Sequence, residues 1–137
     1  MNRNSLRKLA MIRLKEAEAL LATRNYSGAY YLSGYAVECA LKACIAKKTK
    51  RYDFPDLRTA QASWTHDLEK LVKTADLSNS LDQEIGSDPI FYNNWNIIRG
   101  WSEQSRYQIY SKTKAFELYS AIADDQHGVL KWIDQHW

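Results

Sequence analysis

The chain has 137 residues, of which 45% are hydrophobic, enough to close one hydrophobic core. It contains only five Gly and two Pro, and an all-β fold of this length would need many more turn-forming residues, so the composition favours a few long helices. Lys and Arg number 19 against 16 Asp and Glu, and the resulting net charge of +3 permits a nucleic-acid partner without requiring one.

The first predicted helix runs from about Asn4 to Thr23, because apolar side chains recur there at helical spacing. The apolar stripe consists of Leu6, Ala10, Leu14, Ala17 and Leu21. Arg24 and Asn25 break the pattern, and Asn25 is a residue type that favours the N-cap of a following helix.

The second predicted helix, about Tyr26 to Lys48, is apolar on two sides, which predicts the central helix of a bundle. Gly34 lies on one of these apolar stripes, so a side chain added there should overpack a buried contact. A third, narrow stripe of mixed chemistry consists of Tyr31, Tyr35, Glu38 and Lys42. Glu38 and Lys42 have the spacing of a simple surface ion pair, but beside two buried faces they also suit a buried network or a ligand groove.

Residues 52–65 contain a proline and show no clear period, so they are predicted to form a long loop. A short helix should follow with Thr65 as its cap, and we interpret His66, in its first turn, as a structural residue. Its apolar face consists of Leu68, Leu71 and Val72. Ser80 and Gln83 have capping-box spacing, which predicts that a short helical turn starts at Ser80.

Asp88 followed by Pro89 is a typical helix start, and the fourth main helix is predicted from there to about Tyr107. Gly100 would lie inside this helix, which indicates a close packing contact. One face would carry a polar and aromatic stripe of Tyr92, Asn96, Arg99, Glu103 and Arg106. The last helix is predicted over about 111–134, again from the spacing of apolar residues.

These patterns predict an all-α single domain over residues 1–137, an antiparallel bundle of four long helices and one short helix. No run approaches the about 18 apolar residues of a membrane-spanning helix, and residues 1–13 are too basic for a secretory signal. Cys39 and Cys44, on one predicted helix, would lie roughly 8.6 Å apart, beyond disulfide reach, and they are too few for a zinc site. We therefore expect a soluble cytoplasmic protein with reduced, buried thiols and with no metal or cofactor.

The second helix, in the segment NYSGAYYLSGYAVECALKACI, resembles the HEPN family. The resemblance is carried by the Ala and Tyr run, the Gly-Tyr-Ala step, and the Glu and Leu-Lys-Ala that follow. Two further segments agree in order, since THDLEKLV resembles the family's short third helix and RGWSEQSRY the end of its fourth. The resemblance covers about residues 6–132. It implies a five-helix bundle, usually a homodimer, that in many members acts with a minimal nucleotidyltransferase in toxin–antitoxin or defence operons.

Other HEPN proteins are metal-independent ribonucleases with an Arg followed a few residues later by a His. This sequence lacks that spacing, because none of His66, His127 and His136 has an Arg at the required distance, and no His falls within 99–106. Cleavage through the RNA 2′-OH needs a proton acceptor and a group that stabilises the phosphorane charge. Glu103, beside two arginines, would be a poor proton acceptor. The resemblance therefore does not carry the ribonuclease chemistry to this chain.

Two hypotheses follow. The favoured one is a non-catalytic binding or partner module, a homodimer that acts with a nucleotidyltransferase or another operon partner and binds a nucleotide or RNA. Its candidate ligand-binding residues are Tyr31, Tyr35, Glu38, Lys42, Tyr92, Asn96, Arg99 and Arg106. The alternative is a divergent metal-independent ribonuclease whose candidate catalytic residues are Arg99, Glu103, Arg106 and Tyr107. Arg99 and Arg106, two turns apart on one predicted helix, suit a phosphate, and Tyr92 offers a stacking surface.

Overall fold

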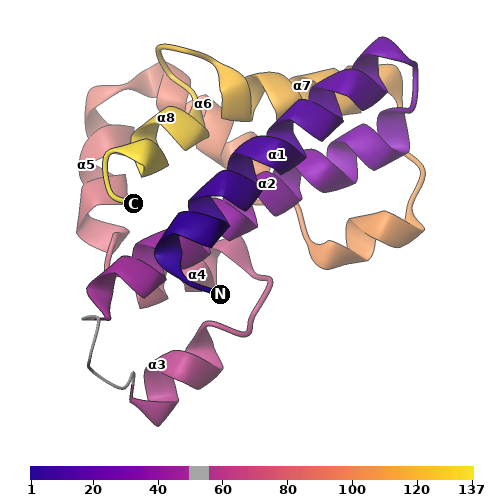
Figure 1. Ribbon diagram of the computed structural model, residues 1–137. Helices are drawn as coiled ribbons and strands as arrows, with labels where there is room; N and C mark the ends of the chain where they lie inside the picture. The colour runs from indigo at the N-terminus through magenta and orange to yellow at the C-terminus, as the bar shows by residue number, and fades with distance from the viewer. Residues whose placement is uncertain (50–55) are drawn as a thin grey trace.

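The computed structural model describes residues 1–49 and 56–137, and these residues form helices and no strand (Figure 1). In chain order the elements are α1 (Arg3–Ala22), α2 (Tyr26–Lys48), α3 (Leu57–Ala62), α4 (Leu68–Thr74), α5 (Ser78–Ser87), α6 (Pro89–Ile98), the 3₁₀ helix η1 (Glu103–Tyr107), α7 (Lys112–Ala123) and α8 (Val129–Asp134). The predicted all-α class is confirmed. The arrangement of four long helices is not, because two of the predicted long helices are each divided.

Helix α2 is the centre of the fold, as its two apolar sides predict. It lies beside α1 along most of its length and also packs against α4, α7, α8 and η1 (Figure 1). Small residues make this close packing feasible, because they let neighbouring backbones approach the helix. Ala29, Ala36, Ala40 and Ala43 are fully buried. A helix surrounded in this way can hold a polar side chain in a fixed, dehydrated position.

The turn between α1 and α2 differs in detail from the sequence prediction. Arg24 has a positive φ of 65°, and the next backbone N–H, that of Asn25, donates to the Leu20 carbonyl at 2.8 Å. This is the hydrogen-bond pattern of a Schellman motif, which ends a helix through one left-handed residue. Asn25 does occupy the N-cap position of α2, but its side chain donates to Thr23 and does not cap the helix.

The segment before α4 was predicted as loop from 52 to 65, and this is wrong in part because α3 lies inside it. The Asp56 side chain caps α3 by accepting from the Thr59 N–H at 2.8 Å. Residues 52–55 of the predicted loop lie outside the described residues. The cap of α4 is Asp67 and not Thr65, because the Asp67 carboxylate accepts from the Lys70 N–H at 3.1 Å.

Helix α5 starts at Ser78, two residues earlier than the capping-box spacing predicts. Ser80 is therefore inside the helix, and its hydroxyl serves a long-range contact. It lies 3.1 Å from His136 Nε2 and accepts from Trp132 Nε1 at 3.4 Å. A tertiary contact with the C-terminal segment has replaced the local capping role that the sequence indicates.

The predicted helix over 89–107 ends early, at Ile98. The start is as predicted, because Asp88 caps α6 by accepting from the N–H groups of Ile90 and Phe91. After Arg99 the chain leaves the helix and re-forms a 3₁₀ turn at η1. Gly100 is exposed, and a Cβ there would approach only the Ile97 carbonyl, at 3.9 Å, so the predicted close packing contact is wrong.

The predicted helix over 111–134 is also divided, into α7 and α8. Asp124 ends α7, and its side chain accepts from the N–H groups of Gln126 and His127 at 2.8 and 2.7 Å. This Asx-type turn competes with helix continuation, since it satisfies the same backbone donors. The break allows α8 to fold back, so that Trp132 packs against Trp95 and Phe91 in the core.

The two cysteines of α2 are buried and do not form a disulfide, as the helical spacing predicts. Burial raises the pKa of the Cys39 and Cys44 thiols to about 11. Thiols of this kind are almost wholly protonated at neutral pH, so they serve as small apolar core residues.

Candidate functional site

Glu38 is a buried carboxylate on the central helix, with 2% of its surface exposed. Its Oε1 atom accepts hydrogen bonds from Lys42 Nζ at 2.9 Å and from His66 Nδ1 at 2.8 Å. The predicted Glu38–Lys42 pair is therefore present, and it is joined by a histidine from the segment before α4. A hydrogen bond from Nδ1 fixes the imidazole orientation and leaves Nε2 as the nitrogen available to another group.

Trp101 lies beside this pair, where the chain runs from α6 to η1. Its indole ring covers Gly34, and the Tyr31 ring stacks near it with centroids 6.1 Å apart. Tyr31 in turn contacts Tyr35, with centroids 6.0 Å apart. Tyr31, of the predicted stripe on α2, therefore packs against the 101–107 segment, and Tyr35 contacts Tyr31 one turn further along α2.

Three polar atoms at this contact between α2 and the η1 region are buried without a hydrogen-bond partner among the described residues. They are Glu38 Oε2, Trp101 Nε1 and Ser105 Oγ. Unpaired buried polar groups are rare, because each costs desolvation free energy that no hydrogen bond offsets. Such atoms often mark a place whose chemistry serves more than packing.

A cavity of about 510 Å³ opens next to this cluster. We call it the His66 cavity. Its charged lining residues are Arg99 and the three carboxylates Asp67, Glu69 and Glu103, and the other described lining residues are Thr65, His66, Gly100, Trp101 and Ser102. The size is typical of small-molecule sites. His66 has 47% of its side chain exposed, so it bridges the buried Glu38 carboxylate and the open cavity.

Arg99 is the main cation of the His66 cavity, and a carboxylate already engages it. Its Nε donates to Glu69 Oε1 at 2.9 Å, and both side chains are about half exposed, at 50% and 53%. A half-exposed ion pair of this kind is weak, because water screens the attraction. An incoming anion can therefore compete with Glu69 for the guanidinium group.

The predicted stripe over Tyr92 to Arg106 does not lie on one helix. Arg99 and Glu103 line the same cavity, but Arg106 belongs to η1, where its guanidinium lies over the Tyr107 ring at 5.1 Å. Asn96 lines a neighbouring depression with Tyr30, and Tyr92 is 46% exposed on α6. The prediction that Arg99 and Arg106 stand two turns apart on one helix is wrong, because α6 ends at Ile98.

His66 is the residue of this site that sequence reasoning passed over as structural. Its local signal is its position directly before the Asp67 cap of α4. Nothing local indicates its partner, because Glu38 lies 28 residues earlier on another helix. The pairing depends on α4 packing against α2.

The fold and this site together define an all-helical protein with a buried Glu–His pair at the edge of a cavity. A family model described as the HEPN domain matches residues 4–135, nearly the whole chain. The chain therefore belongs to the HEPN family. No curated protein and no solved structure matches it. In the described part of the chain, no helix has the length and apolarity needed to cross a membrane.

Proposed function

We propose that this HEPN protein is a non-catalytic binding and partner module whose ligand site is the His66 cavity. The observation that carries the proposal is the position of Arg99 and His66 on one cavity, each held by a carboxylate from a different helix. Side chains held in this way are pre-organised, so a ligand loses less conformational entropy when it binds.

An anionic ligand such as a nucleotide or an RNA strand fits the donors of this cavity. Guanidinium groups recognise phosphate oxygens through paired hydrogen bonds, and His66 adds one more donor, Nε2–H, when its imidazole is protonated. The Ser102 and Thr65 hydroxyls on the lining can bond to a sugar or base. Binding requires Arg99 to exchange its Glu69 partner for the ligand.

The partner part of the proposal is a homodimer that works with a nucleotidyltransferase or another toxin–antitoxin or defence operon partner. Membership of the HEPN family supports it. Large apolar side chains on the surface also support an interface, since Ile109 is 96% and Tyr107 73% exposed. Light scattering that gives a monomer at tens of micromolar protein would contradict the dimer, and a nucleotidyltransferase gene beside this reading frame would support the partner.

The second candidate is a metal-independent ribonuclease, and the Glu38–His66 hydrogen bond favours it. A carboxylate that holds imidazole Nδ1 orients Nε2 for proton transfer, and Arg99 on the same cavity can stabilise developing phosphorane charge. In this version His66, and not Glu103, accepts the proton from the 2′-OH. Glu69 counts against it, because it neutralises Arg99.

One pair of assays separates the two candidates. Binding of a labelled single-stranded RNA and of ATP is measured over a salt titration, and RNA cleavage is measured with EDTA present. The variants are Arg99→Ala and His66→Ala, with Arg106→Ala as a control that removes the same charge outside the cavity. We expect binding without cleavage, weakened by about tenfold in Arg99→Ala and unchanged in the control.

Cleavage by the wild-type protein that His66→Ala abolishes in a folded variant would establish the ribonuclease. Equal losses of binding in Arg99→Ala and Arg106→Ala would show a general charge effect and contradict a site in the His66 cavity. A wild-type protein that neither binds nor cleaves would leave the Arg99–Glu69 pair with a structural role only, and the proposal would be wrong.

A further inference from the structure

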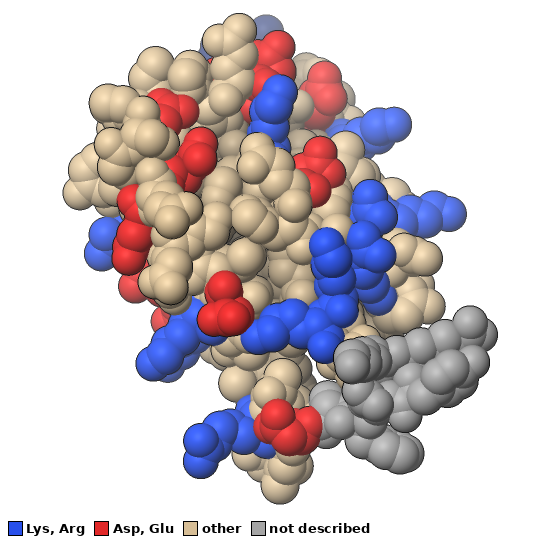
Figure 2. Space-filling view, turned by 90° about the vertical axis from the view of Figure 1, so that its left-hand side faces the viewer, with Lys and Arg blue, Asp and Glu red and all other residues tan. Residues whose placement is uncertain are grey.

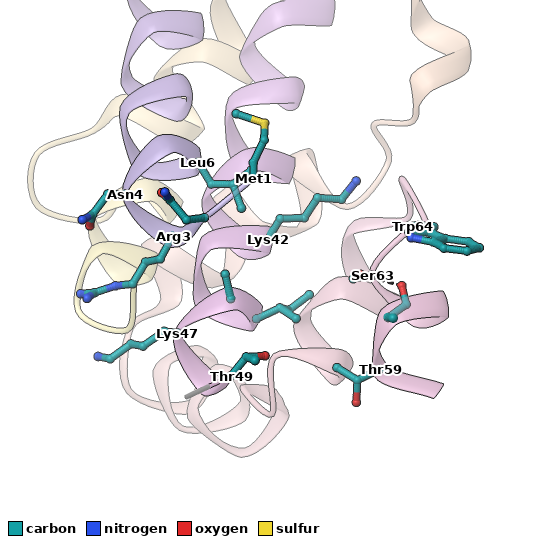
Figure 3. A pocket seen from close by; sticks show the side chains of 14 residues that line it. Met1, Arg3, Asn4, Leu6, Lys42, Lys47, Thr49, Thr59, Ser63 and Trp64 are labelled. Carbon is teal, nitrogen blue, oxygen red and sulfur yellow. Dashed lines mark hydrogen bonds between the residues drawn. The ribbon is translucent and has the colours of Figure 1, made fainter. Parts of the chain in front are cut away.

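A larger groove lies at the end of the molecule where α1 begins and α2 ends, with α3 across from them, and has a volume of about 1200 Å³ (Figure 3). We call it the basic groove. The first turn of α1 forms one wall, the last turns of α2 form the floor, and α3 with the following residue Trp64 forms the opposite wall. It is separate from the His66 cavity, with which it shares no lining residue.

The charged side chains that line the basic groove are all cationic. They are Arg3, Lys42 and Lys47, and no Asp or Glu is among the described lining residues. Lys42 is paired with Glu38, so Arg3 and Lys47 supply most of the net charge. Figure 2 shows Lys and Arg side chains gathered at this end of the molecule. The groove therefore has a positive potential.

The remaining described lining mixes apolar side chains with the uncharged polar residues Asn2, Asn4, Thr49, Thr59 and Ser63. Leu6, Ile45 and Ala46 line the groove from α1 and α2, and in Figure 3 Trp64 stands on the opposite side. Trp64 has 70% of its surface exposed, an uncommon state for an indole ring in water. Trp side chains are enriched at protein-binding surfaces, where the ring packs against a partner.

We propose that the basic groove binds an acidic amphipathic segment of a partner protein. Apolar side chains of the segment would pack on Ile45 and Trp64, and its carboxylates would pair with Arg3 and Lys47 at the rim. A protein segment suits the groove better than nucleic acid does, because the walls offer apolar surface and few cations to track a phosphate backbone. This inference names the chemistry of a partner for the proposed module, and the described lining residues of its surface differ from those of the ligand site.

Arg3 is well placed for this role because its position is fixed. Its Nη2 donates to the Trp137 carbonyl at 2.7 Å, which ties the start of α1 to the C-terminal segment. A cation whose position is already held by one contact can bind a carboxylate without first being ordered.

The test uses a fluorescein-labelled helical peptide with Leu at i, i+3, i+4 and i+7 and Glu at the other positions, measured by fluorescence polarisation. Two matched peptides replace Glu by Lys or Leu by Ser. We expect the acidic Leu peptide to bind, and both matched peptides to bind at least about tenfold more weakly. Lys47→Glu and Trp64→Ala should each weaken binding by about tenfold. Lys112→Glu makes the same charge change at the first residue of α7, outside the groove, and should have less than about a twofold effect.

Three results would overturn the proposal. The acidic Leu peptide fails to bind, or Lys47→Glu and Lys112→Glu weaken it equally, or a labelled single-stranded RNA binds more tightly than the peptide and is lost in the same groove variants. Arg99→Ala separates this inference from the proposed function. It should leave peptide binding unchanged, while Trp64→Ala should leave nucleotide binding unchanged, so either site can fail without the other.

Discussion

Gly34 on α2 lies directly under the indole ring of Trp101, and a Cβ at position 34 would overlap three atoms of that ring. The missing side chain is what lets the 101–107 segment reach the central helix. Trp101 is then 3% exposed, and it forms part of the wall of the His66 cavity. The absence of a side chain at Gly34 thus determines where Trp101, and with it the wall of the His66 cavity, can lie.

We expect Gly34→Leu to lower the free energy of unfolding by more than about 3 kcal/mol, because the Trp101 ring cannot move without opening the core. Urea unfolding followed by circular dichroism measures this. Gly86→Ala is the matched control on α5, where a Cβ meets nothing within 4 Å, and it should be neutral or slightly stabilising. A Gly34→Leu midpoint close to that of wild type would show that Trp101 does not rest on position 34.

The Glu38 carboxylate should contribute to stability mainly through His66. Glu38→Ala is expected to cost about 1–3 kcal/mol, since the imidazole and the ammonium lose a buried acceptor. A double-mutant cycle of Glu38→Ala with His66→Ala should give a coupling energy of about 0.5 kcal/mol or more. A second double-mutant cycle, of Glu38→Ala with Lys42→Ala, gives the coupling energy of the ion pair for comparison. A zero coupling with His66 would contradict the hydrogen bond.

His127 and Asp88 form a pair that should make stability depend on pH. His127 Nδ1 and Asp88 Oδ2 are 2.6 Å apart, and the hydrogen bond with Asp88 raises the pKa of His127 above its ordinary value of 6.5. The same bond lowers the pKa of Asp88 below 3.8. The His127 contribution is complete below pH 6.5 and is lost as the pH rises through its raised pKa. The Asp88 contribution is complete above pH 3.8 and is lost as the pH falls through its lowered pKa.

The stability difference between wild type and His127→Gln should therefore be largest between about pH 4 and pH 6.5, and should shrink at higher pH. Urea midpoints measured across this range test it. His136 should behave in the opposite sense, because burial lowers its pKa below 6.5, so its contribution is lost as the pH falls. A difference for His127→Gln that stays constant from pH 5 to pH 9 would contradict the pairing.

Arg24 and Asp76 are the two non-glycine residues with positive φ, at 65° and 61°, among the residues described here. Each ends a helix in the left-handed conformation, which disfavours side chains with a Cβ by about 1–2 kcal/mol. We expect Arg24→Gly and Asp76→Gly each to raise the unfolding free energy by a few tenths to about 1 kcal/mol. Ala19→Gly, at an exposed position inside α1, should lower it, and thermal unfolding compares the three. If Arg24→Gly and Asp76→Gly both lowered the unfolding free energy, this prediction would be wrong.

The sequence determined the features that depend on neighbouring residues. The central position of α2 follows from its two apolar sides, and the start of α6 follows from Asp88 and Pro89. The Glu38–Lys42 pair follows from one turn of helix. Each of these is set by spacing along a single helix, so the local pattern is sufficient. The HEPN resemblance, carried by segments of this kind, is confirmed over residues 4–135.

Only the tertiary structure decided where helices break and which distant side chains meet. Ile98 and Trp101 keep a helical spacing, as do Ile122 and Val129, so the apolar pattern alone did not place the ends of α6 and α7. The breaks allow Trp101 to be buried against Gly34 and Trp132 to be buried in the core, which removes apolar surface from water. The His66–Glu38 and Arg99–Glu69 contacts join separate elements. Contacts of this kind depend on how helices pack, which the spacing of residues along one helix does not encode.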